Sequence, residues 1–599
     1  MRLRRSIAFI GIDLLLIAIA FLFFTASWQV THLRVERTVF TTNAYRTPLV
    51  TDAHPIWLPP GTTQAELTTD FTLGWIHPVL LQFRPNDCLE SIRLNDYDIT
   101  STKIPYCNHL QDQTIRLGQY LRTGNNTLYV HLRNHGGDAT LAFSVPWYDP
   151  IRISLLICAC IPLIIIFWKH TKNMRGKGQK TEVLLGVAIA GGVLLRVFYL
   201  AVTPFLIRGH DVWGHIEYIE YMAEYWSIPL ARDGWQFYHP PLYYMLTGAW
   251  YAIGASFGRG RQMLIGDVQM ISLVLSVITF VLAAVWIGKL LFPKKTEQTE
   301  RTLFAAILAT FPSFVFFAGR INNDVLLLFW SVLGIGYLLV WWRHQGKRML
   351  PWFFCIVMIA LGTLTKSNAL LLIPAPFICL VMLQSMKWRK RIAIGCMGIL
   401  LFVLLTGWHA FLRFGVEKHT SVVANITHLN QNLRVDNSVR SFTTFAPSRI
   451  VQEPYNDPFD EQSGRRWFFE YLFKSAFFGE FHFGSGFYFL SSLILLNALV
   501  LLPIIGIGLW QACTSRLRTD LPMLLVLLFS IGGHLLYRQT APFSSSQDFR
   551  YSIVSLLPLA YFLITGIRSM PQSFQRPALA VAYGGVCFCA LFLGGIGPI

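Results

Sequence analysis

Residues 183–202 read VLLGVAIAGGVLLRVFYLAV, and Arg196 is the one charged side chain in this run. A helix that spans the hydrocarbon core of a bilayer needs roughly 20 predominantly apolar residues. Lys169, Lys172, Arg175, Lys177 and Lys180 precede the run, and such basic patches collect in cytoplasmic loops. The stretch therefore predicts a transmembrane helix that begins at the cytoplasmic surface and ends outside.

The composition extends this reading to the whole chain. Of 599 residues, 53% are hydrophobic and 14% are charged, whereas soluble globular proteins carry roughly 25% charged residues. The formal net charge of +18 sits in short clusters between apolar runs and forms no compact basic face, so it does not indicate a nucleic-acid partner. The composition predicts an integral, multi-pass membrane protein with no nucleic acid bound.

Twelve further apolar runs are separated by basic or polar breaks. They cover residues 7–28, 153–168, 269–291, 302–319, 325–342, 352–364, 367–383, 392–412, 484–510, 520–537, 553–567 and 577–598. Thirteen crossings put every basic break inside and the C-terminus outside, as the positive-inside rule requires. A fourteenth apolar segment, 240–257, would invert the later loops if it crossed, so we expect it to lie along or dip into the outer leaflet.

The runs predict four parts of the chain: an uncleaved anchor at 1–29, an extracytoplasmic β-sandwich at 30–150, a second transmembrane helix with a basic loop at 151–180, and an α-helical membrane domain at 181–599. The last part carries long outer loops at 203–240 and 413–483. In a prokaryote the membrane would be the plasma membrane.

Residues 30–150 show the period-two alternation and turn residues of short strands. Cys88 to Asp98, together with Leu121 to Leu128, resembles galactose-binding-like jelly-roll domains. The resemblance implies a sugar-binding module, and the alternative, which we favour, is a structural sandwich. Cys88 and Cys107 are the two cysteines of this region, and a disulfide between them would suit an oxidising compartment.

The chemically richest stretch is the first large outer loop of the membrane domain. It opens with Arg208-Gly209-His210-Asp211 and closes with His239-Pro240-Pro241-Leu242-Tyr243-Tyr244. Asp211 and His215 are four residues apart and would share one face of a helix. Ionisable residues at a membrane surface are costly to hold there and mark functional sites.

These elements resemble the GT-C superfamily of polyprenyl-phosphate-sugar-dependent glycosyltransferases, which includes protein O-mannosyltransferases and aminoarabinose transferases. Asp211 and the His239 to Tyr244 element match two parts of the first outer loop of that superfamily. Asp324, in Arg320-Ile321-Asn322-Asn323-Asp324, matches a second acidic residue, and Thr365-Lys366 matches a later pair. Many relatives have two adjacent acids at the first position, whereas Val212 follows Asp211 here. That departure puts in doubt any mechanism that needs a second carboxylate.

The resemblance implies transfer of a sugar from a lipid-linked donor to an acceptor hydroxyl on the extracytoplasmic face, with inversion. A carboxylate can take the hydroxyl proton as the anomeric bond breaks, and fixed cations can stabilise the departing phosphate. We assign Asp211 as general base and Asp324 as a catalytic support or acceptor-positioning residue. Further substrate-binding candidates are Arg208, His215, His239, Tyr243, Lys366 and Arg550.

Each assignment has a structural alternative. Both aspartates stand where a helix N-cap is favoured, and Lys366 could be a snorkelling lysine. Arg196 and Arg320 are interpreted as snorkelling residues outside the site. His210, His215 and His239 with Asp211 could instead hold a divalent metal, although no cofactor is required by the sequence.

Two other functions remain open at this stage. A transporter or flippase for a lipid-linked glycan should show ionisable residues deep in several helices and inverted repeats. A non-catalytic scaffold would not explain the His, Asp and Glu residues gathered between 208 and 239. The predicted partners are a lipid-linked sugar donor, a hydroxyl acceptor on protein, lipid or glycan, and membrane lipids.

Overall fold

The computed structural model falls into two units, residues 1–175 with 597–599 and residues 176–596. It describes residues 33–51, 56–59, 62–85, 88–99, 106–107, 113–134, 140–145, 149–151, 177–203, 205, 208–418, 431–483 and 487–596, with single positions between 19 and 30 and between 154 and 158. The predicted helices at 7–28 and 153–168 lie outside the described residues apart from those single positions.

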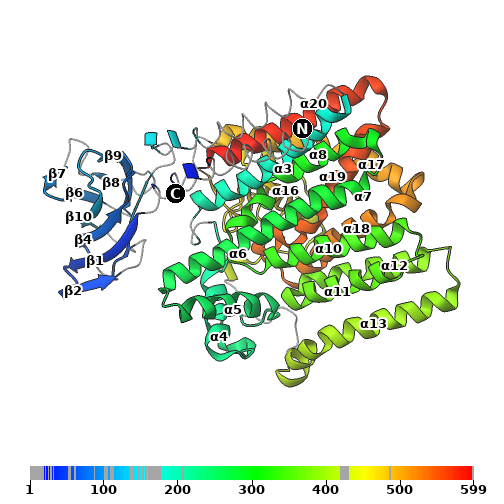
Figure 1. The fold of residues 1–599 in the computed structure, drawn as a ribbon, viewed down its shortest axis with the longest axis horizontal. Coiled ribbons are helices and arrows are strands. Elements are labelled where there is room, and N and C mark those ends of the chain that lie inside the picture. The colour runs from blue at the N-terminus through cyan, green and yellow to red at the C-terminus, as the bar shows by residue number, and fades with distance from the viewer. Residues whose placement is uncertain are drawn as a thin grey trace, which may run out of the picture. The chain divides into compact units, whose positions relative to one another are not determined.

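The first unit contains two antiparallel β-sheets (Figure 1). The larger is ordered β2 (Tyr45–Thr51), β1 (Arg34–Thr42), β4 (Gln64–Leu73), β10 (Gly124–Arg133), β6 (Cys88–Leu94) and β7 (Tyr97–Asp98), with β8 (Tyr106–Cys107) also on β6. The smaller is ordered β3 (Ile56–Trp57), β11 (Thr140–Ser144), β5 (Leu80–Pro85) and β9 (Gln113–Arg116).

The two sheets share one apolar core. Buried and exposed residues alternate along β4, and Phe71 of this strand lies 6.2 Å, centroid to centroid, from Phe143 of β11 in the other sheet. Period-two burial on facing sheets is the packing of a β-sandwich. The predicted β-sandwich is therefore confirmed.

Local turn chemistry sets the strand register of this unit. Asn95 turns the chain between β6 and β7 with a left-handed φ of 54°, a conformation that Asn tolerates. Its side chain accepts from the Thr127 amide at 3.0 Å and donates to the Tyr120 carbonyl at 2.9 Å. Cys88 is disulfide-bonded, and the strand register sets Cys107 opposite it, as the predicted disulfide requires.

The second unit is a bundle of helices, eight of which, among the described residues, are long and apolar enough to cross a membrane. These are α3 (Lys177–Val202), α6 (Arg261–Val281) continued by α7 (Gly288–Leu291), α10 (Asp324–Arg343), α13 (Trp388–Ala410), α17 (Tyr488–Thr514), α18 (Leu517–Thr540), α19 (Leu556–Ser569) with the turns before it, and α20 (Gln572–Gly595). The chain is an integral membrane protein.

Three of the predicted runs form shorter helices. α8 (Gln298–Thr310) and α9 (Pro312–Phe316) meet at a bend of 60°, since a residue before proline is driven out of the helical region and Phe311 is extended there. α11 (Leu350–Thr365) and α12 (Pro374–Met382) are apolar but short. The described residues of each predicted run from 183 onward are mostly helical. Eight or nine helices meet the length requirement in the described part, so the count of thirteen stays a prediction.

The segment at 240–257 forms α5 (Leu242–Ser256). At 15 residues it is too short for a full crossing. It packs on α4 (Val212–Tyr225) at one end of the bundle (Figure 1). This agrees with the expectation that the segment does not span the bilayer.

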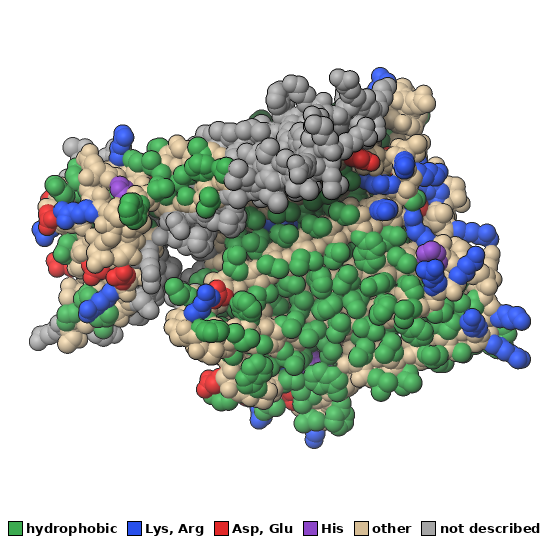
Figure 2. All heavy atoms as spheres, in the orientation of Figure 1, with side chains coloured by type: hydrophobic (Ala, Val, Ile, Leu, Met, Phe, Trp, Pro, Cys, Tyr) green, Lys and Arg blue, Asp and Glu red, His purple; other side chains and the backbone are tan. Residues whose placement is uncertain are grey.

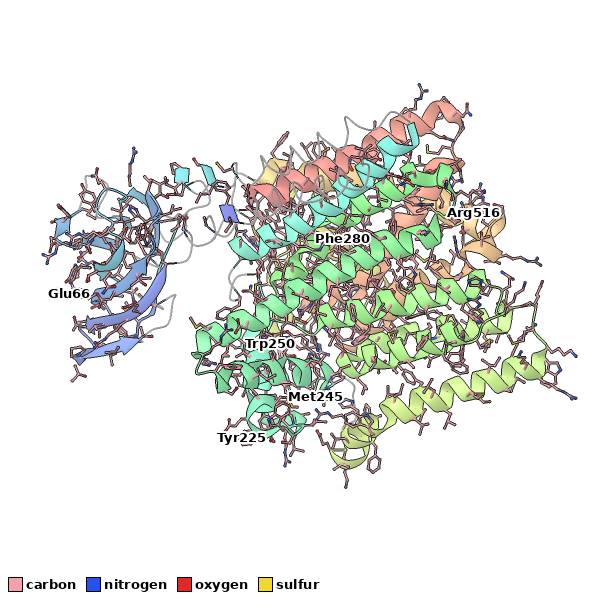
Figure 3. All side chains as sticks on the ribbon, viewed as in Figure 1. Glu66, Tyr225, Met245, Trp250, Phe280 and Arg516 are labelled. Atoms are coloured by element: carbon pink, nitrogen blue, oxygen red, sulfur yellow. The ribbon has the colours of Figure 1, made fainter. Side chains whose placement is uncertain are left out.

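Charge divides the helical unit into two ends. Figure 2 shows a broad hydrophobic surface with Lys and Arg gathered along the right-hand edge. Arg516 is labelled at that end in Figure 3, and Tyr225, Met245 and Trp250 lie at the other. We call the end that carries Arg516 the basic end, and the end that carries Tyr225, Met245 and Trp250 the loop end. α10 runs from Asp324 at the loop end to Arg343 at the basic end.

Arg196 does not snorkel as interpreted from the sequence. Its side chain is fully buried among the helices, and its guanidinium lies 4.2 Å from the centroid of the Phe280 ring. It also donates to the Gly192 carbonyl at 2.9 Å. Backbone carbonyls and an aromatic face satisfy the cation inside the bundle.

Candidate functional site

Five segments distant in sequence bring ionisable side chains together at the loop end. They are the turn 208–211 before α4, the turn 320–324 before α10, Lys366 between α11 and the next 3-10 turn, Glu480 after α16 (Phe468–Phe478), and 548–550 before α19. We call this group the charge cluster. Buried ionisable residues in such numbers are costly unless they serve a purpose.

Asp211 occupies the N-cap position of α4, but its side chain makes no capping hydrogen bond. Its φ is 53°, whereas capping residues are normally extended. The carboxylate is exposed and accepts a hydrogen bond of 3.3 Å from the Trp235 indole. The ordinary explanation for an Asp at this position, capping, therefore does not apply.

Arg208, three residues earlier, also has a positive φ, of 54°. For a side chain of this kind the left-handed region costs on the order of 1–2 kcal/mol. Its guanidinium lies 4.7 Å from the centroid of the Phe483 ring. Backbone strain of this sort concentrates at functional sites, and here it shapes the turn that carries His210 and Asp211.

Asp324 and Lys366 form a buried ion pair. Lys366 Nζ lies 2.6 Å from Asp324 Oδ1, with side chains 7% and 1% exposed. Asn323, not Asp324, is the N-cap of α10. The second carboxylate oxygen of Asp324 is buried and has no hydrogen-bond partner. Lys366 does not reach the surface as a snorkelling lysine would.

His210 stands between two carboxylates. Its Nδ1 is 3.5 Å from Glu480 Oε2, and its Nε2 is 3.4 Å from Asp548 Oδ2. These three residues offer ligand atoms that lie within 4.8 Å of one another, and imidazole with carboxylates suits several divalent ions. Among the described residues this trio, and not His215 and His239 with Asp211, is the arrangement that can hold a divalent cation.

Burial sets the protonation of the groups around His210. Burial, together with the nearby Asp548 carboxylate, raises the pKa of Glu480 to about 8. Burial, and secondly the Arg550 guanidinium, lowers the pKa of His210 well below its usual value. Burial therefore favours the uncharged imidazole of His210 and the protonated form of Glu480 when no cation is bound.

Two buried arginines complete the charge cluster. Arg550 lies 3.8 Å from Asp548 Oδ2 and donates to the Tyr551 hydroxyl at 3.0 Å. Arg320, which the sequence interpretation left out, is 4% exposed and lies 4.9 Å from the Phe481 ring centroid. Its Nε makes no hydrogen bond. Both guanidinium groups are held at the loop end, and each keeps a nitrogen, Nε, that makes no hydrogen bond.

A turn at Gly479 directs the chain after α16 toward these arginines. Gly479 has a φ of 63°, a left-handed conformation that glycine adopts without steric cost. A Cβ added there would meet the Phe481 ring at 3.1 Å and Arg320 Nη2 at 3.5 Å. The glycine thus permits the close approach of Glu480 and Phe481 to Arg320.

The remaining predicted residues of the first loop form an aromatic stack. His215 Nδ1 is 2.8 Å from the Tyr244 hydroxyl, and its ring stacks on His239 at 5.9 Å between centroids. Burial lowers the pKa of His215 to about 4, although the Asp211 carboxylate opposes this shift. Tyr243 packs edge-on against Tyr244 in the core of the bundle, 1% exposed.

Arg413, just past α13, hydrogen-bonds to the loop that carries His239. Its guanidinium donates to the Pro229 carbonyl at 3.1 Å and to the Phe237 carbonyl at 2.6 Å. Glu417, paired with Arg413, accepts from the Ala231 amide at 3.1 Å. The end of α13 therefore holds the 229–237 segment in place.

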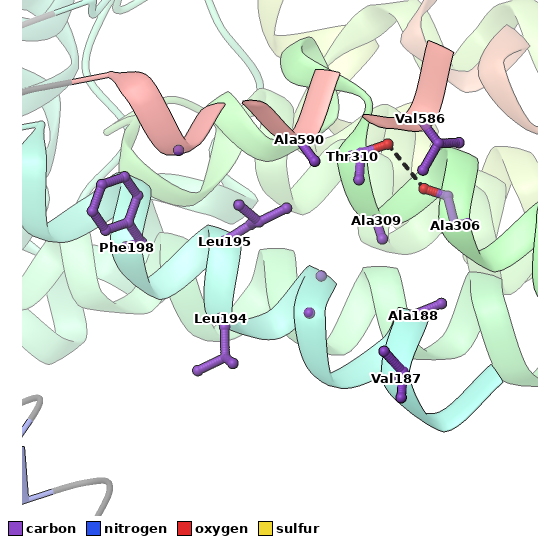
Figure 4. A pocket seen from close by; sticks show the side chains of 13 residues that line it. Val187, Ala188, Leu194, Leu195, Phe198, Ala306, Ala309, Thr310, Val586 and Ala590 are labelled. Carbon is purple, nitrogen blue, oxygen red and sulfur yellow. Dashed lines mark hydrogen bonds between the residues drawn. The ribbon is translucent and has the colours of Figure 1, made fainter. Parts of the chain in front are cut away.

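An apolar cavity of about 700 Å³ lies beside the charge cluster. Its lining includes Phe311, Phe477 and Phe549, and Phe549 directly joins Asp548 to Arg550 in the chain. A second apolar pocket, of about 480 Å³, lies between α3, α8 and α20 (Figure 4). Of these two cavities, the larger one has Phe549, a neighbour of the charge cluster, in its lining, and the smaller one does not.

No protein-family model and no curated protein matches the chain. Among solved structures it is similar to the Archaeoglobus fulgidus oligosaccharyltransferase in complex with zinc and sulfate, with 14% identity and a TM-score of 0.42, over 68% of this chain and 52% of that one. This chain thus covers about half the length of that protein. It is also similar to ArnT from Cupriavidus metallidurans bound to undecaprenyl phosphate, with 14% identity and a TM-score of 0.40, over 70% and 76% of the two chains.

A third similar structure is the arabinosyltransferase EmbB from Mycobacterium smegmatis, with 11% identity and a TM-score of 0.34, over 97% of this chain and 63% of that one. All three are glycosyltransferases of the GT-C superfamily.

The structure brings together Asp324, Lys366, Arg550 and the turn of Asp211, all of which the sequence nominated. It adds Arg320, Glu480 and Asp548. Asp548 was visible in the sequence only as the residue before Phe549-Arg550, and Glu480 as the residue after a helix-ending glycine. Neither motif signals that the two carboxylates flank one histidine.

Proposed function

We propose that the chain is a membrane glycosyltransferase of the GT-C type. It takes a sugar from a polyprenyl-phosphate donor and transfers it, with inversion, to an acceptor hydroxyl on the extracytoplasmic face. The observation that carries the proposal is the exposed Asp211 carboxylate, freed from capping by its left-handed backbone and set in the turn that also brings His210 to Asp548.

In the proposed reaction the Asp211 carboxylate removes the proton of the acceptor hydroxyl. The hydroxyl oxygen forms a bond to the anomeric carbon as the bond from that carbon to the lipid phosphate breaks. The departing phosphate gains negative charge, which prepositioned cations stabilise more strongly in a dry site than in water. Lys366, Arg320 and Arg550 are the buried cations that would serve.

The donor's hydrocarbon chain needs an apolar binding region next to these cations. The cavity of about 700 Å³, with Phe549 in its lining, supplies apolar surface next to Asp548 and Arg550. A lipid-linked donor would place its phosphate at the charge cluster and its chain along this cavity. Nucleotide sugars have no comparable tail, so the cavity favours a lipid donor.

The positive-inside rule supports an extracytoplasmic site. The clusters Lys294-Lys295, Arg343 to Arg348 and Lys387 to Arg391 lie at the basic end, and the charge cluster lies at the loop end of the same helices. A cytoplasmic basic end puts the site outside. A divalent cation on His210, Glu480 and Asp548 would belong to the same face and would order the turn next to Asp211.

A transporter for a lipid-linked glycan would need ionisable groups along the middle of several helices. In the described part of the bundle the charge cluster is confined to the loop end, and Arg196 is held by carbonyls and aromatic rings. This distribution favours chemistry at one surface over passage across the membrane.

The donor class can be tested with purified protein in liposomes. Radiolabelled sugar would be supplied as polyprenyl phosphate, as polyprenyl diphosphate or as nucleotide sugar, with mixed hydroxyl acceptors. We expect label transfer from the polyprenyl phosphate, and only when the acceptor contacts the face carrying loop 203–240. Transfer from a nucleotide sugar, or from the opposite face, would contradict the proposal.

A further inference from the structure

A second cavity, of about 620 Å³, lies at the basic end of the helical unit. Four segments far apart in sequence line it, 290–297, 339–345, 516–523 and 561–569. Arg516, labelled in Figure 3, belongs to this lining and lies far from Met245 and Trp250 of the loop end. We call it the basic cavity. It is separate from the charge cluster and has no part in the proposed reaction.

Each carboxylate that lines the basic cavity already has its own arginine. Asp520, 1% exposed, pairs with Arg516 at 2.9 Å and accepts from the Tyr561 hydroxyl at 2.7 Å. Glu297 pairs with Arg568 at 2.9 Å. The acids therefore neutralise two cations and no more.

Three further cations line the same cavity and form no direct ion pair with a carboxylate among the described residues. They are Lys294, Arg343 and Arg518, all exposed. Arg518 donates to the neutral Gln384 side chain at 3.0 Å. The lining therefore has five cations and two carboxylates. Glu300, just outside the lining, lies 3.6 Å from Arg568 Nε, so the net excess around the space is two to three positive charges.

The positive-inside rule accounts for the sign of these residues but not for their convergence on a cavity. Apolar side chains, among them Leu290, Leu339 and Met523, also line the cavity, and we call them the apolar wall. A concave site with mixed walls and excess positive charge suits an anion that also carries apolar surface. Basic pockets between membrane helices on the cytoplasmic side bind lipid head groups in this way.

We propose that the basic cavity binds a phosphate-bearing anion. Lys294, Arg343 and Arg518 hold the phosphate, and the wall around Leu290 and Leu339 receives the adjoining apolar part. An anionic lipid head group and a soluble phosphate share this chemistry, and the apolar wall is what the lipid would use in addition.

The test uses the full-length protein in phosphatidylcholine nanodiscs. One arm adds increasing phosphatidylglycerol, and the other adds inorganic phosphate to the buffer, while the thermal midpoint and bound lipid by native mass spectrometry are measured. The cavity variant is Arg343→Gln with Arg518→Gln. The matched control is Lys387→Gln with Arg389→Gln, which removes the same charge from exposed positions at the same end, outside the cavity lining.

We expect the wild type and the control to be stabilised in at least one arm. The cavity variant should need roughly thirtyfold more ligand for the same shift, since each of the two basic residues removed adds about fivefold to anion binding near the membrane surface. A response to phosphatidylglycerol alone identifies the lipid, and a response to phosphate alone identifies the soluble anion. No stabilisation in either arm, or equal responses of the cavity variant and the control, would overturn the proposal.

Discussion

The two ends of the helical unit use charge in opposite ways. At the loop end, Asp324 and Lys366 are both buried, 1% and 7% exposed, and meet at 2.6 Å. At the basic end, Glu297 is likewise mostly buried at 10%, but its partner Arg568 is 45% exposed, and unpaired cations stand around it. The loop-end pair buries both of its charges, whereas the basic-end pair buries its acid and leaves its cation half-exposed.

The difference shows which ion pairs lower the stability of the fold. Half-exposed ion pairs change the free energy of unfolding little in either direction. Membrane topology or anion binding is enough to explain why the chain keeps them. Burying an ion pair costs desolvation energy that its attraction seldom recovers in full. The charge cluster also leaves Asp324 Oδ2, Asp548 Oδ2 and Arg320 Nε without hydrogen bonds. Such an arrangement is retained where it binds or transforms something.

The largest effect should come from breaking the buried pair. Asp324→Ala leaves Lys366 charged and unpaired, which we expect to lower the free energy of unfolding by about 3–5 kcal/mol. Glu297→Ala, the matched change at the basic end, should cost about 1 kcal/mol or less. Both would be measured by denaturation in detergent micelles. Equal losses would remove the contrast between the two ends.

A smaller effect, on activity rather than folding, is expected from Arg320. Arg320→Gln removes a buried cation without leaving an acid that depended on it for a direct ion pair. We expect the kcat/KM for the lipid donor to fall roughly 100-fold, with an unchanged thermal midpoint. Lys387→Gln, an exposed cation at the basic end, serves as control. If both variants kept wild-type kinetics, Arg320 would be structural only.

The smallest effect is expected at the basic end. Arg343→Gln, assayed in phosphatidylcholine without added phosphate, should change the free energy of unfolding by less than about 0.5 kcal/mol. Arg343 forms no direct ion pair among the described residues, so its removal leaves no buried carboxylate without its partner. A loss comparable to that of Asp324→Ala would mean that the basic end, too, depends on buried electrostatics.

The helices could be predicted because lipid imposes a simple pattern on sequence. The run at 325–342 coincides with α10 to within one residue at each end, and the run at 392–412 falls mostly within α13. The bend between α8 and α9 was less legible, although Pro312 marks it. In the first unit, the period-two alternation expected within residues 30–150 is borne out in β10, whose two faces differ in burial.

The site was predictable only in part. Resemblance and local chemistry pointed to Asp211, Asp324 and Lys366, whose catalytic and binding roles stay predictions. The flanking of His210 by Glu480 and Asp548 depends on packing between segments some 270 and 340 residues apart in the chain, which no local pattern encodes. Arg320 looked like a snorkelling residue because sequence cannot tell a cation at the membrane surface from one turned inward. Tyr243 was chosen over Tyr244, yet Tyr244 makes the contact with His215.

The central claim, that the Asp211 carboxylate acts as the base, is tested most directly by one rate. Transfer from a labelled polyprenyl-phosphate sugar would be compared in wild type, Asp211→Asn and Asp233→Asn, the last being an exposed aspartate of the same loop. We expect Asp211→Asn to lose roughly 100- to 10,000-fold in rate while folding normally, and Asp233→Asn to match wild type. Full transfer by Asp211→Asn would contradict the account.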